Sequence, residues 1–151
     1  MRKILTLVIV KKDAQVLLGM KKRGFGQGKW NGFGGKVQVD ETITDACSRE
    51  LYEEAGITPI DLTELGILEF TFSTNDDILE VHIFVCTTYS GEVGESEEMK
   101  PQWFPIEEIP FSQMWTSDAY WFPLFLEGKQ FRGNFHFDAD ENVKSHELVI
   151  V

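Results

Sequence analysis

The sequence predicts an α/β sandwich, and three observations support this fold class. Several stretches of the chain alternate between apolar and polar residues or run apolar, which is the pattern of β-strands. Two further stretches carry the start signals of α-helices. The chain has 151 residues, 42% of them hydrophobic and 13% aromatic, which is enough for one core. We therefore expect a single domain over residues 1–151.

The first two strands are expected to form a hairpin. Residues 3–11 run apolar, residues 12–14 carry a turn signal, and residues 15–20 return as a second strand. The start of the chain has some likeness to a secretion signal, but lysines follow its short apolar run and no small-residue cleavage site is present. A strand is the better interpretation, and no segment is expected to cross a membrane.

A glycine-rich loop is predicted over residues 21–36. It contains six glycines and shows neither helical nor strand periodicity. Glycine lets a backbone approach a phosphate closely, so the loop is a candidate phosphate site, with a solvated turn as the alternative. The loop holds five of the fourteen cationic side chains of the protein: Lys21, Lys22, Arg23, Lys29 and Lys36.

A helix is predicted to begin after Thr42 and to end before Gly56. Thr42, with Asp45 three residues later, is typical of an N-cap and its capping-box partner. Gly56 is a C-terminal stop signal. Every fourth residue of this helix is apolar, which gives it one face to bury: Ile43, Cys47, Leu51 and Ala55.

Three acids of the same helix are spaced to share one face. Glu53 and Glu54 follow Glu50 by three and four residues, and Glu50 and Glu54 fall beside the apolar stripe. A half-buried carboxylate is costly unless it is paired or binds a metal, and hard divalent ions prefer oxygen ligands. The spacing therefore indicates a divalent-metal site. A salt-bridged amphipathic helix is the alternative, and the EF-hand loop pattern is absent.

The second half of the chain is expected to complete the sheet and to add a second helix. This helix should start at Ser117 or Asp118, and Pro123 inside it predicts a kink or a later start. An acidic loop covers residues 90–98. Strands are predicted at residues 65–74 and 78–88, around a turn at 75–77, and at residues 100–104, 130–137 and 146–151.

Charge and cysteine usage bound the partners and the compartment. The net charge of −11 argues against polymeric nucleic acid or an anionic membrane as a partner. An anionic substrate would therefore need cations inside the site. Cys47 and Cys86 fall in a predicted helix and a predicted strand, which is typical of reduced core cysteines and indicates a reducing compartment such as the cytoplasm.

The acidic helix and the loop before it match the Nudix box, Gly-x5-Glu-x7-Arg-Glu-φ-x-Glu-Glu-x-Gly-φ. By these residues the chain is identified as a member of the Nudix hydrolase family, whose fold is an α/β/α sandwich with a central mixed β-sheet. Residues 16–38, 95–104, 109–115 and 120–124 also resemble the family branch of eukaryotic MutT homologues, which hydrolyse oxidised purine nucleoside triphosphates such as 8-oxo-dGTP. The matching box positions are Gly35, Glu41, Arg49, Glu50, Leu51, Glu53, Glu54, Gly56 and Ile57.

The resemblance implies a magnesium-dependent hydrolysis to a nucleoside monophosphate and pyrophosphate. Mg²⁺, with Mn²⁺ as a substitute, would be bound by Glu50, Glu53, Glu54, Glu98 and the carbonyl of Gly34. Arg49 would pair with Glu41 and orient these acids. Either Glu54 or Glu53 is expected to be the general base, with Glu98 as the rival. A solvated loop acid is the alternative for Glu98, since Glu95 and Glu97 are its neighbours.

The resemblance also implies where the nucleotide binds. Trp115 would stack on the base, Asn31 and Asp118 would bond its edge, and Lys21 would contact the polyphosphate. The alternative for each aromatic residue of this set is a purely structural place in the core. The alternative for Asp118 is the N-cap of the following helix. The other residues expected at or near the substrate are Thr6, Leu7, Phe25, Phe33, Gly34, Gly35, Lys36, Phe70, Leu79, Met99, Thr116, Ser117 and Phe137.

One departure from the family pattern bears on specificity. Ser117 stands where the family has the first of two adjacent aspartates. Because serine cannot carry charge or reach as far, we expect 8-oxo-dGTP to be preferred over 2-hydroxy-dATP. Leu79, in place of a methionine, is a mild change of wall shape.

Two other functions remain as alternatives at this point. One is a Nudix hydrolase with another substrate, such as ADP-ribose, a dinucleoside polyphosphate or a methylated purine nucleotide. The other is a nucleotide- or metal-binding module without catalysis, which the presence of Arg49 and the three box acids disfavours. A monomer is expected by default. Nuclear or mitochondrial nucleotide pools are alternatives to the cytoplasm.

Overall fold

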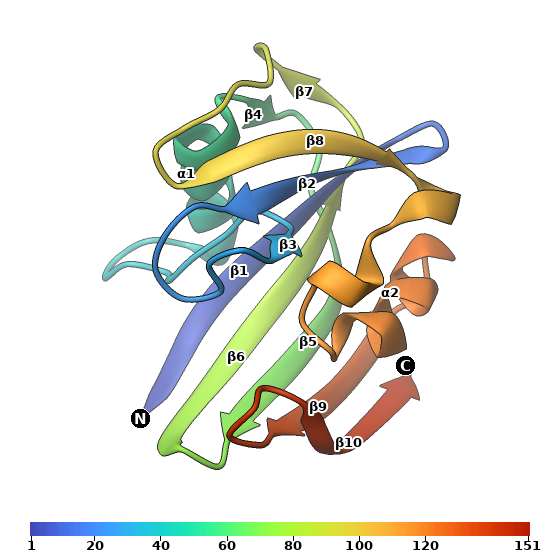
Figure 1. Cartoon of the computed structure of the whole chain (residues 1–151). Coiled ribbons are helices and arrows are strands. Elements are labelled where there is room, and N and C mark those ends of the chain that lie inside the picture. The colour runs from blue at the N-terminus through green and yellow to red at the C-terminus, as the bar shows by residue number, and fades with distance from the viewer.

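The computed structural model describes residues 1–151, and a mixed β-sheet runs through its centre (Figure 1). Its strands are β1 (Arg2–Lys12), β2 (Gln15–Lys21), β3 (Trp30–Asn31), β5 (Thr63–Phe72), β6 (Asn75–Cys86), β8 (Met99–Pro105), β9 (Phe131–Phe137) and β10 (Val143–Ile150). The order across the sheet is β10-β9-β5-β6-β1-β2-β3, and β8 also pairs with β2. β1 is parallel to β6 and β5 to β9, while the other pairs are antiparallel.

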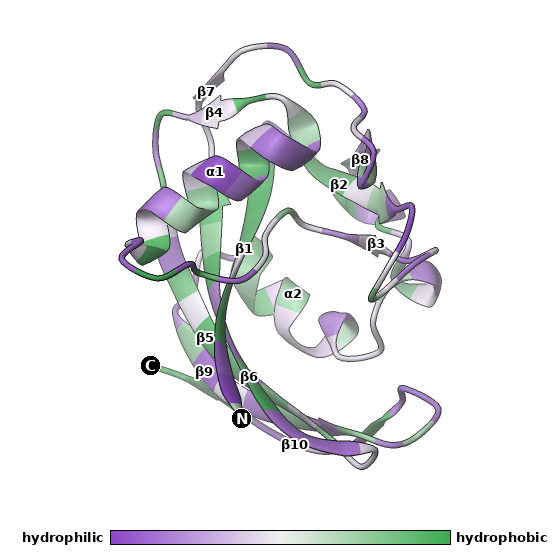
Figure 2. Ribbon diagram, turned by 90° about the vertical axis from the view of Figure 1, so that its left-hand side faces the viewer, coloured by the Kyte–Doolittle hydropathy of each residue, from purple (hydrophilic) through white to green (hydrophobic).

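The two helices, α1 (Ile43–Ala55) and α2 (Asp118–Leu126), cover different faces of the sheet. In β1, Val8 and Val10 belong to the core cluster that contains Leu51 of α1, whereas Ile9 belongs to the cluster that contains Trp121 of α2. Successive strand residues point to opposite faces, so the sheet lies between the helices. Figure 2 shows the helices on either side of β1. The predicted α/β/α sandwich with a mixed sheet is confirmed.

The core on the α2 side is largely aromatic. Its fully buried aromatic members come from α2 and from β9, where every second residue points to the same face. Aromatic rings of this size contribute much of the apolar area that a core buries. The fully buried aromatic side chains of this cluster are Trp121, Phe122, Phe125, Phe131, Phe135 and Phe137.

Helix α1 has the bounds that its end signals predict. Thr42 Oγ1 accepts a hydrogen bond of 3.1 Å from the backbone N–H of Asp45, which is the N-cap contact. Such a cap is worth about 1 kcal/mol. Gly56 follows the helix with φ of 77°, a left-handed conformation that favours glycine, and its N–H donates to the carbonyl of Tyr52. Cys47 and Cys86 are buried and unpaired, as predicted.

The hairpin of β5 and β6 turns two residues earlier than predicted. The turn lies at Ser73 and Thr74, and residues 75–77 belong to β6. Phe72 of β5 pairs with Asn75, so the strands stay in contact up to the turn. The polar residues Asn75, Asp76 and Asp77 gave a turn signal, but strand pairing decides their conformation. Three two-residue strands had no sequence signal: β3, β4 (Thr58–Pro59) and β7 (Tyr89–Ser90).

Helix α2 starts at Asp118, and Pro123 lies within it without ending it. Proline lacks the N–H that would bond the carbonyl four residues earlier, at Ala119. Ala119 is exposed, so solvent can take over that acceptor. The later start offered as one outcome is wrong. Two short 3₁₀ helices precede α2, η1 (Ile106–Glu108) and η2 (Phe111–Gln113). Neither α-helix combines the length and apolar character needed to cross a bilayer.

Gly66→Ala is expected to destabilise the fold by about 1–3 kcal/mol through overpacking. A Cβ at Gly66 would lie 2.2 Å from Cε2 of Phe131, which is completely buried. The free energy of unfolding from urea titration measures the loss. Gly94→Ala is the matched control, because a Cβ there meets nothing within 4 Å and its effect should stay within about 0.5 kcal/mol. Equal stabilities of the two variants would contradict this account of the β5–β9 packing.

Candidate active site

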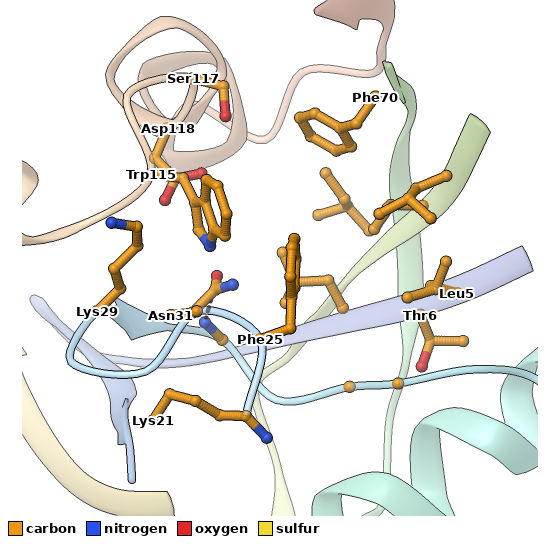
Figure 3. A pocket seen from close by; sticks show the side chains of 18 of the residues that line it. Leu5, Thr6, Lys21, Phe25, Lys29, Asn31, Phe70, Trp115, Ser117 and Asp118 are labelled. Carbon is orange, nitrogen blue, oxygen red and sulfur yellow. Dashed lines mark hydrogen bonds between the residues drawn. The ribbon is translucent and has the colours of Figure 1, made fainter. Parts of the chain in front are cut away.

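A cavity of about 280 Å³ opens on the α2 side of the sheet. Strands β1, β5, β6 and β9 supply its floor, and the 21–36 loop and the segment that leads into α2 supply its rim. Figure 3 shows the side chains around it. Most of its walls are apolar or aromatic, from Leu5, Leu7, Phe25, Phe70, Phe72, Leu79, Val81, Ile83, Met99, Trp115, Trp121 and Phe137.

Three buried polar atoms at this cavity have no hydrogen-bond partner. They are Oγ1 of Thr6, Oγ of Ser117 and Oδ2 of Asp118, and no other buried side-chain nitrogen or oxygen in the protein lacks a partner. All three residues line the cavity. A buried polar group without a partner costs about 1–3 kcal/mol, which a polar ligand would remove. The cavity is therefore built for a ligand with polar groups on its edge.

Asp118 is the one of these three residues that can carry a charge. Its Oδ1 accepts a hydrogen bond of 3.1 Å from Nε1 of Trp121, which leaves Oδ2 free. Burial raises the pKa of Asp118 to about 7, and the Trp121 hydrogen bond only partly opposes this. Ser117 occupies the N-cap position without a side-chain hydrogen bond, so the Asp118 carboxyl is not the cap of α2. The protonated form can donate from Oδ2.

Trp115 lies at the rim of the cavity, with its ring among other aromatics. The Phe25 ring stacks on it at a centroid distance of 5.0 Å, and Phe137 meets it edge-on at 5.5 Å. Phe25 comes from the glycine-rich loop and is 65% exposed. Asn31 also lines the cavity, and its Oδ1 accepts from the N–H of Gly32, which leaves the side-chain NH₂ without a protein partner.

The acids of α1 lie at different depths. Glu54 is buried, lines the cavity and accepts a hydrogen bond of 2.9 Å from the N–H of Gly34. Burial and repulsion by Glu50 raise the pKa of Glu54 to about 8, against the opposing Gly34 contact. The side chain of Glu50 is 14% exposed, whereas that of Glu53 is 55% exposed. The predicted position at the edge of the buried stripe is confirmed for Glu50 and Glu54.

Arg49 pairs with Glu41, as predicted, and it also contacts two acids of α1 and the preceding loop. Its Nε and Nη2 bind both oxygens of Glu41 at 2.7 and 3.0 Å, and Nη1 lies 2.7 Å from Glu50 Oε1 and 3.4 Å from Glu53 Oε2. Nη2 also donates to the carbonyl of Lys36. The Arg49 hydrogen bonds lower the pKa of Glu41 to about 2, so this acid is charged at neutral pH.

Glu98 is tied to two cations of the glycine-rich loop. Lys21 Nζ lies 2.7 Å from Oε2, and Arg23 Nε and Nη2 lie 3.1 and 3.0 Å from Oε1. These hydrogen bonds lower the pKa of Glu98. Lys21 also lines the cavity, and its charge lowers the pKa of Glu54.

The acidic end of the cavity fits a hard divalent cation. Its donors are carboxylate and carbonyl oxygens, and a cation would remove the repulsion between Glu50 and Glu54 that raises the pKa of Glu54. A Cβ at Gly35 would lie 2.6 Å from Glu50 Oε1, so a side chain there would require the Glu50 carboxylate to move. No three acid, histidine or cysteine side chains converge on one point, because Glu53 turns to Arg49 and Glu98 to Lys21 and Arg23.

The cavity brings together most of the residues that were expected at or near the substrate, together with Glu54, which was expected to be catalytic and a metal ligand. Those that line it are Thr6, Leu7, Lys21, Phe25, Asn31, Gly34, Gly35, Glu54, Phe70, Leu79, Met99, Trp115, Ser117, Asp118 and Phe137. Phe33, Lys36 and Thr116 are not among them. The Phe33 side chain is fully buried in the α1 core cluster, and Thr116 donates to the carbonyl of Glu141. The cavity lining also does not include Arg49, Glu50, Glu53 and Glu98.

Several lining residues were not expected from the sequence. Phe72 follows Phe70 by two residues on β5, and Val81 and Ile83 follow Leu79 at the same spacing on β6, so strand periodicity could have found them. Trp121 has no comparable local signal. Lys29 was counted only as one of the loop cations. The others are Leu5, Gly26 and Gly32.

Comparisons with known proteins agree with this geometry. A family model described as the NUDIX domain matches residues 1–125. The chain is 54% identical to a Danio rerio protein named oxidized purine nucleoside triphosphate hydrolase, and 49% identical to the Mus musculus protein of that name. Each match covers 97% of this chain and 94% of the relative. A solved structure, the MutT mutator protein from Bacillus halodurans, superposes with a TM-score of 0.87 at 29% identity, over 97% of both chains.

Asp118→Asn is expected to flatten the pH dependence of stability. The pKa of Asp118 is about 7 in the folded protein against an ordinary value of 3.8, so between these values the folded state keeps a proton that the unfolded chain has lost. This stabilisation is fully present below pH 4 and is lost as pH rises through 7. Over this range the free energy of unfolding of the wild type should therefore fall by up to about 4 kcal/mol more than that of Asp118→Asn. Urea titrations of both proteins from pH 4 to 8 measure it, and parallel curves would contradict it.

Proposed function

The chain is a member of the NUDIX domain family and a hydrolase of oxidised purine nucleoside triphosphates, and we propose how its cavity holds and cleaves these substrates. One observation carries the proposal. A single cavity joins three unpartnered polar atoms among aromatic walls to a buried carboxylate at its acidic end. The aromatic walls suit a flat base, the polar atoms suit the edge of that base, and the acidic end suits the phosphates with their cation.

The base lies against Trp115 in this proposal, with its edge toward Asp118. A carboxyl whose pKa is raised to about 7 is protonated in a large fraction of molecules at neutral pH. It donates a hydrogen bond from Oδ2 to a carbonyl or ring nitrogen of the oxidised purine. Ser117 Oγ and Thr6 Oγ1 supply neutral donors or acceptors, and the free NH₂ of Asn31 adds a donor.

The phosphates extend toward the glycine-rich loop and α1. Nudix hydrolases generally need a divalent metal, and we infer Mg²⁺ here, with Mn²⁺ as a substitute. The ligands would be Glu50, Glu53, Glu54, Glu98 and the carbonyl of Gly34. When bound, the metal neutralises phosphate charge and lowers the pKa of a water molecule to make it a nucleophile. Lys21, at the same end of the cavity, contacts the polyphosphate.

Glu54 is the best candidate for the residue that accepts the proton of the attacking water. It is the only box acid that lines the cavity, and it lies at the end where the phosphates are proposed to bind. Glu53 and Glu98 are the other candidates for this role. Arg49 positions the acids through Glu41 and Glu50 and does not itself line the cavity.

The products would be the nucleoside monophosphate and pyrophosphate, and the biological role would be to remove oxidised purines from the nucleotide pool. Two unpaired buried cysteines support a reducing compartment, the cytoplasm, with nuclear or mitochondrial pools also open to such an enzyme. The net charge of −11 disfavours polymeric nucleic acid and anionic membranes as partners. We propose that the 151 residues act as one domain and as a monomer.

A pyrophosphate-release assay on a nucleotide panel tests the proposed function. The panel contains 8-oxo-dGTP, 2-hydroxy-dATP, dGTP, ADP-ribose and a dinucleoside polyphosphate, each with and without Mg²⁺. For ADP-ribose and the dinucleoside polyphosphate, release of the nucleoside monophosphate is measured as well. The oxidised purine triphosphates should have the highest kcat/KM, and only with the metal. A higher kcat/KM for ADP-ribose or the dinucleoside polyphosphate would overturn the substrate assignment.

Ser117 is expected to narrow the choice of oxidised base. With one carboxyl in place of two at the base edge, 8-oxo-dGTP should be hydrolysed with a higher kcat/KM than 2-hydroxy-dATP. Ser117→Asp should reduce that ratio by about tenfold, the factor for one charged hydrogen bond of about 1.5 kcal/mol. Ser112→Asp, at an exposed position on η2, is the control for added charge. Equal efficiency of the wild type on both substrates would show that Ser117 does not select.

Glu54→Gln is expected to lower kcat by at least about a hundredfold, the magnitude typical of a general acid–base group. Glutamine preserves the shape and the acceptor for the Gly34 N–H but removes the proton-accepting oxygen. Pyrophosphate release at saturating Mg²⁺ and substrate measures the effect. Glu107→Gln, an exposed acid on η1, is the control. Turnover close to that of the wild type would rule out this role for Glu54.

A further inference from the structure

Lys29 lies at the cavity without a role in the chemistry described above. Its Nζ is 5.1 Å from the centroid of the Trp115 ring, over the ring face, and its side chain is 29% exposed. Figure 3 shows Lys29 and Phe25 on opposite sides of the Trp115 indole. Phe25 stacks on the face opposite Lys29 (Figure 3) and is 65% exposed, so a purine that stacks on that face takes the place of the Phe25 ring.

Contacts from a distant part of the chain hold this arrangement. Lys29 Nζ lies 3.7 Å from Oε1 of Glu141, in the turn between β9 and β10. The carbonyl of Glu141 accepts from Thr116 Oγ1 at 3.1 Å, and Thr116 Oγ1 in turn accepts from the N–H of Val143. Three segments that are far apart in the sequence therefore meet around Trp115: the glycine-rich loop, the residues before α2 and the β9–β10 turn.

The backbone of Glu141 indicates that this meeting point is specified. Its φ is 63°, in the left-handed region that residues other than glycine rarely adopt. Such a conformation persists where surrounding contacts hold it in place. Here the contacts are the turn hydrogen bond from the Glu141 N–H to the carbonyl of Asp138 and those with Thr116 and Lys29, next to the ring that lines the cavity. The Lys29–Glu141 ion pair is partly exposed, so by itself it would contribute little to stability. Its effect is therefore on the placement of Trp115.

A cation on one face of an indole affects the opposite face in two ways. It fixes the tilt of the ring, since the attraction is largest when the ammonium lies over the ring face. It also draws π-electron density toward itself, which makes the opposite face a better partner for an electron-rich base. Both effects act on the base and not on the phosphates.

We propose that Lys29 is a positioning residue for base recognition: with Glu141 it fixes Trp115 as the stacking surface for the purine. The proposal rests on the proposed function, because it concerns the same cavity and the same substrate class. Its consequence is that Lys29 sets the affinity for the base, and therefore KM, while kcat depends on the acidic end.

The test separates base binding from phosphate binding with two metal-free probes. The Kd values of 8-oxo-deoxyguanosine, which has no phosphate, and of inorganic pyrophosphate are measured by calorimetry for the wild type, Lys29→Met and Lys29→Arg. Lys29→Met should raise the nucleoside Kd about threefold or more, the factor expected for loss of a cation–π contact. Lys29→Arg, which keeps the cation, should restore it. The pyrophosphate Kd should not change.

A matched control is available elsewhere in the chain. Lys12 lies over the ring of Tyr89, with Nζ 5.9 Å from its centroid, and does not line the cavity. Lys12→Met removes the same charge and a similar cation–π contact, and it should leave both Kd values unchanged. In the Mg²⁺-dependent assay, Lys29→Met should raise KM for 8-oxo-dGTP while kcat stays within about twofold, as loss of uniform binding predicts. Tryptophan emission should shift in Lys29→Met and not in Lys12→Met.

Three results would overturn the proposal. The first is an unchanged nucleoside Kd in Lys29→Met. The second is a weakened pyrophosphate Kd with intact nucleoside binding, which would make Lys29 a phosphate ligand. The third is failure of Lys29→Arg to restore nucleoside binding although thermal unfolding shows that it is folded. If the wild type instead hydrolyses no oxidised purine triphosphate, the proposed function fails, whatever the Lys29 variants show for the nucleoside.

Discussion

The arrangement of the acidic end depends on one guanidinium group. Arg49 presents five N–H donors in a fixed plane, and it directs them to Glu41, Glu50, Glu53 and the carbonyl of Lys36. It therefore ties the helix that carries the acids to the loop that precedes it. Without that contact, like charges on one helical face would repel and the loop would lose its side-chain link to α1.

Close approach of the glycine-rich loop to β1 links this acidic end to the base end. The N–H of Thr6 donates to the carbonyl of Gly35, and Val8 exchanges hydrogen bonds with Phe33. A Cβ at Gly34 would lie 1.8 Å from the carbonyl oxygen of Thr6, so a side chain there is excluded. The same short stretch thus presents the Gly34 N–H to Glu54 and keeps Thr6 beside the cavity. A nucleotide that spans the cavity would meet both ends along this stretch.

Features with short-range causes were predictable, and those with long-range causes were not. The bounds of α1 follow from Thr42 and Gly56, whose effects act within one helical turn. The position of the β5–β6 turn was missed because the pairing of Phe72 with Asn75 outweighs the turn preference of residues 75–77. Strands β3, β4 and β7 are two residues long, too short to show any periodicity. The Arg49–Glu41 pair was predictable only through the family pattern, since seven residues of loop and helix lie between the two.

The amino-acid sequence alone was sufficient for the fold class, the helix with its acids and the family to which the chain belongs, because these depend on periodicity, end caps and fixed spacing. It was sufficient to place Glu50 and Glu54 at the edge of the buried stripe, but not to show how deeply each acid is buried. Glu54 is buried and Glu53 is exposed although they are neighbours, since one points to Gly34 and the other to Arg49. Nor could it show that Lys29, Trp115 and Glu141 meet, or that Thr6, Ser117 and Asp118 share one cavity. Those contacts form only when the sheet and α2 bring together segments more than eighty residues apart.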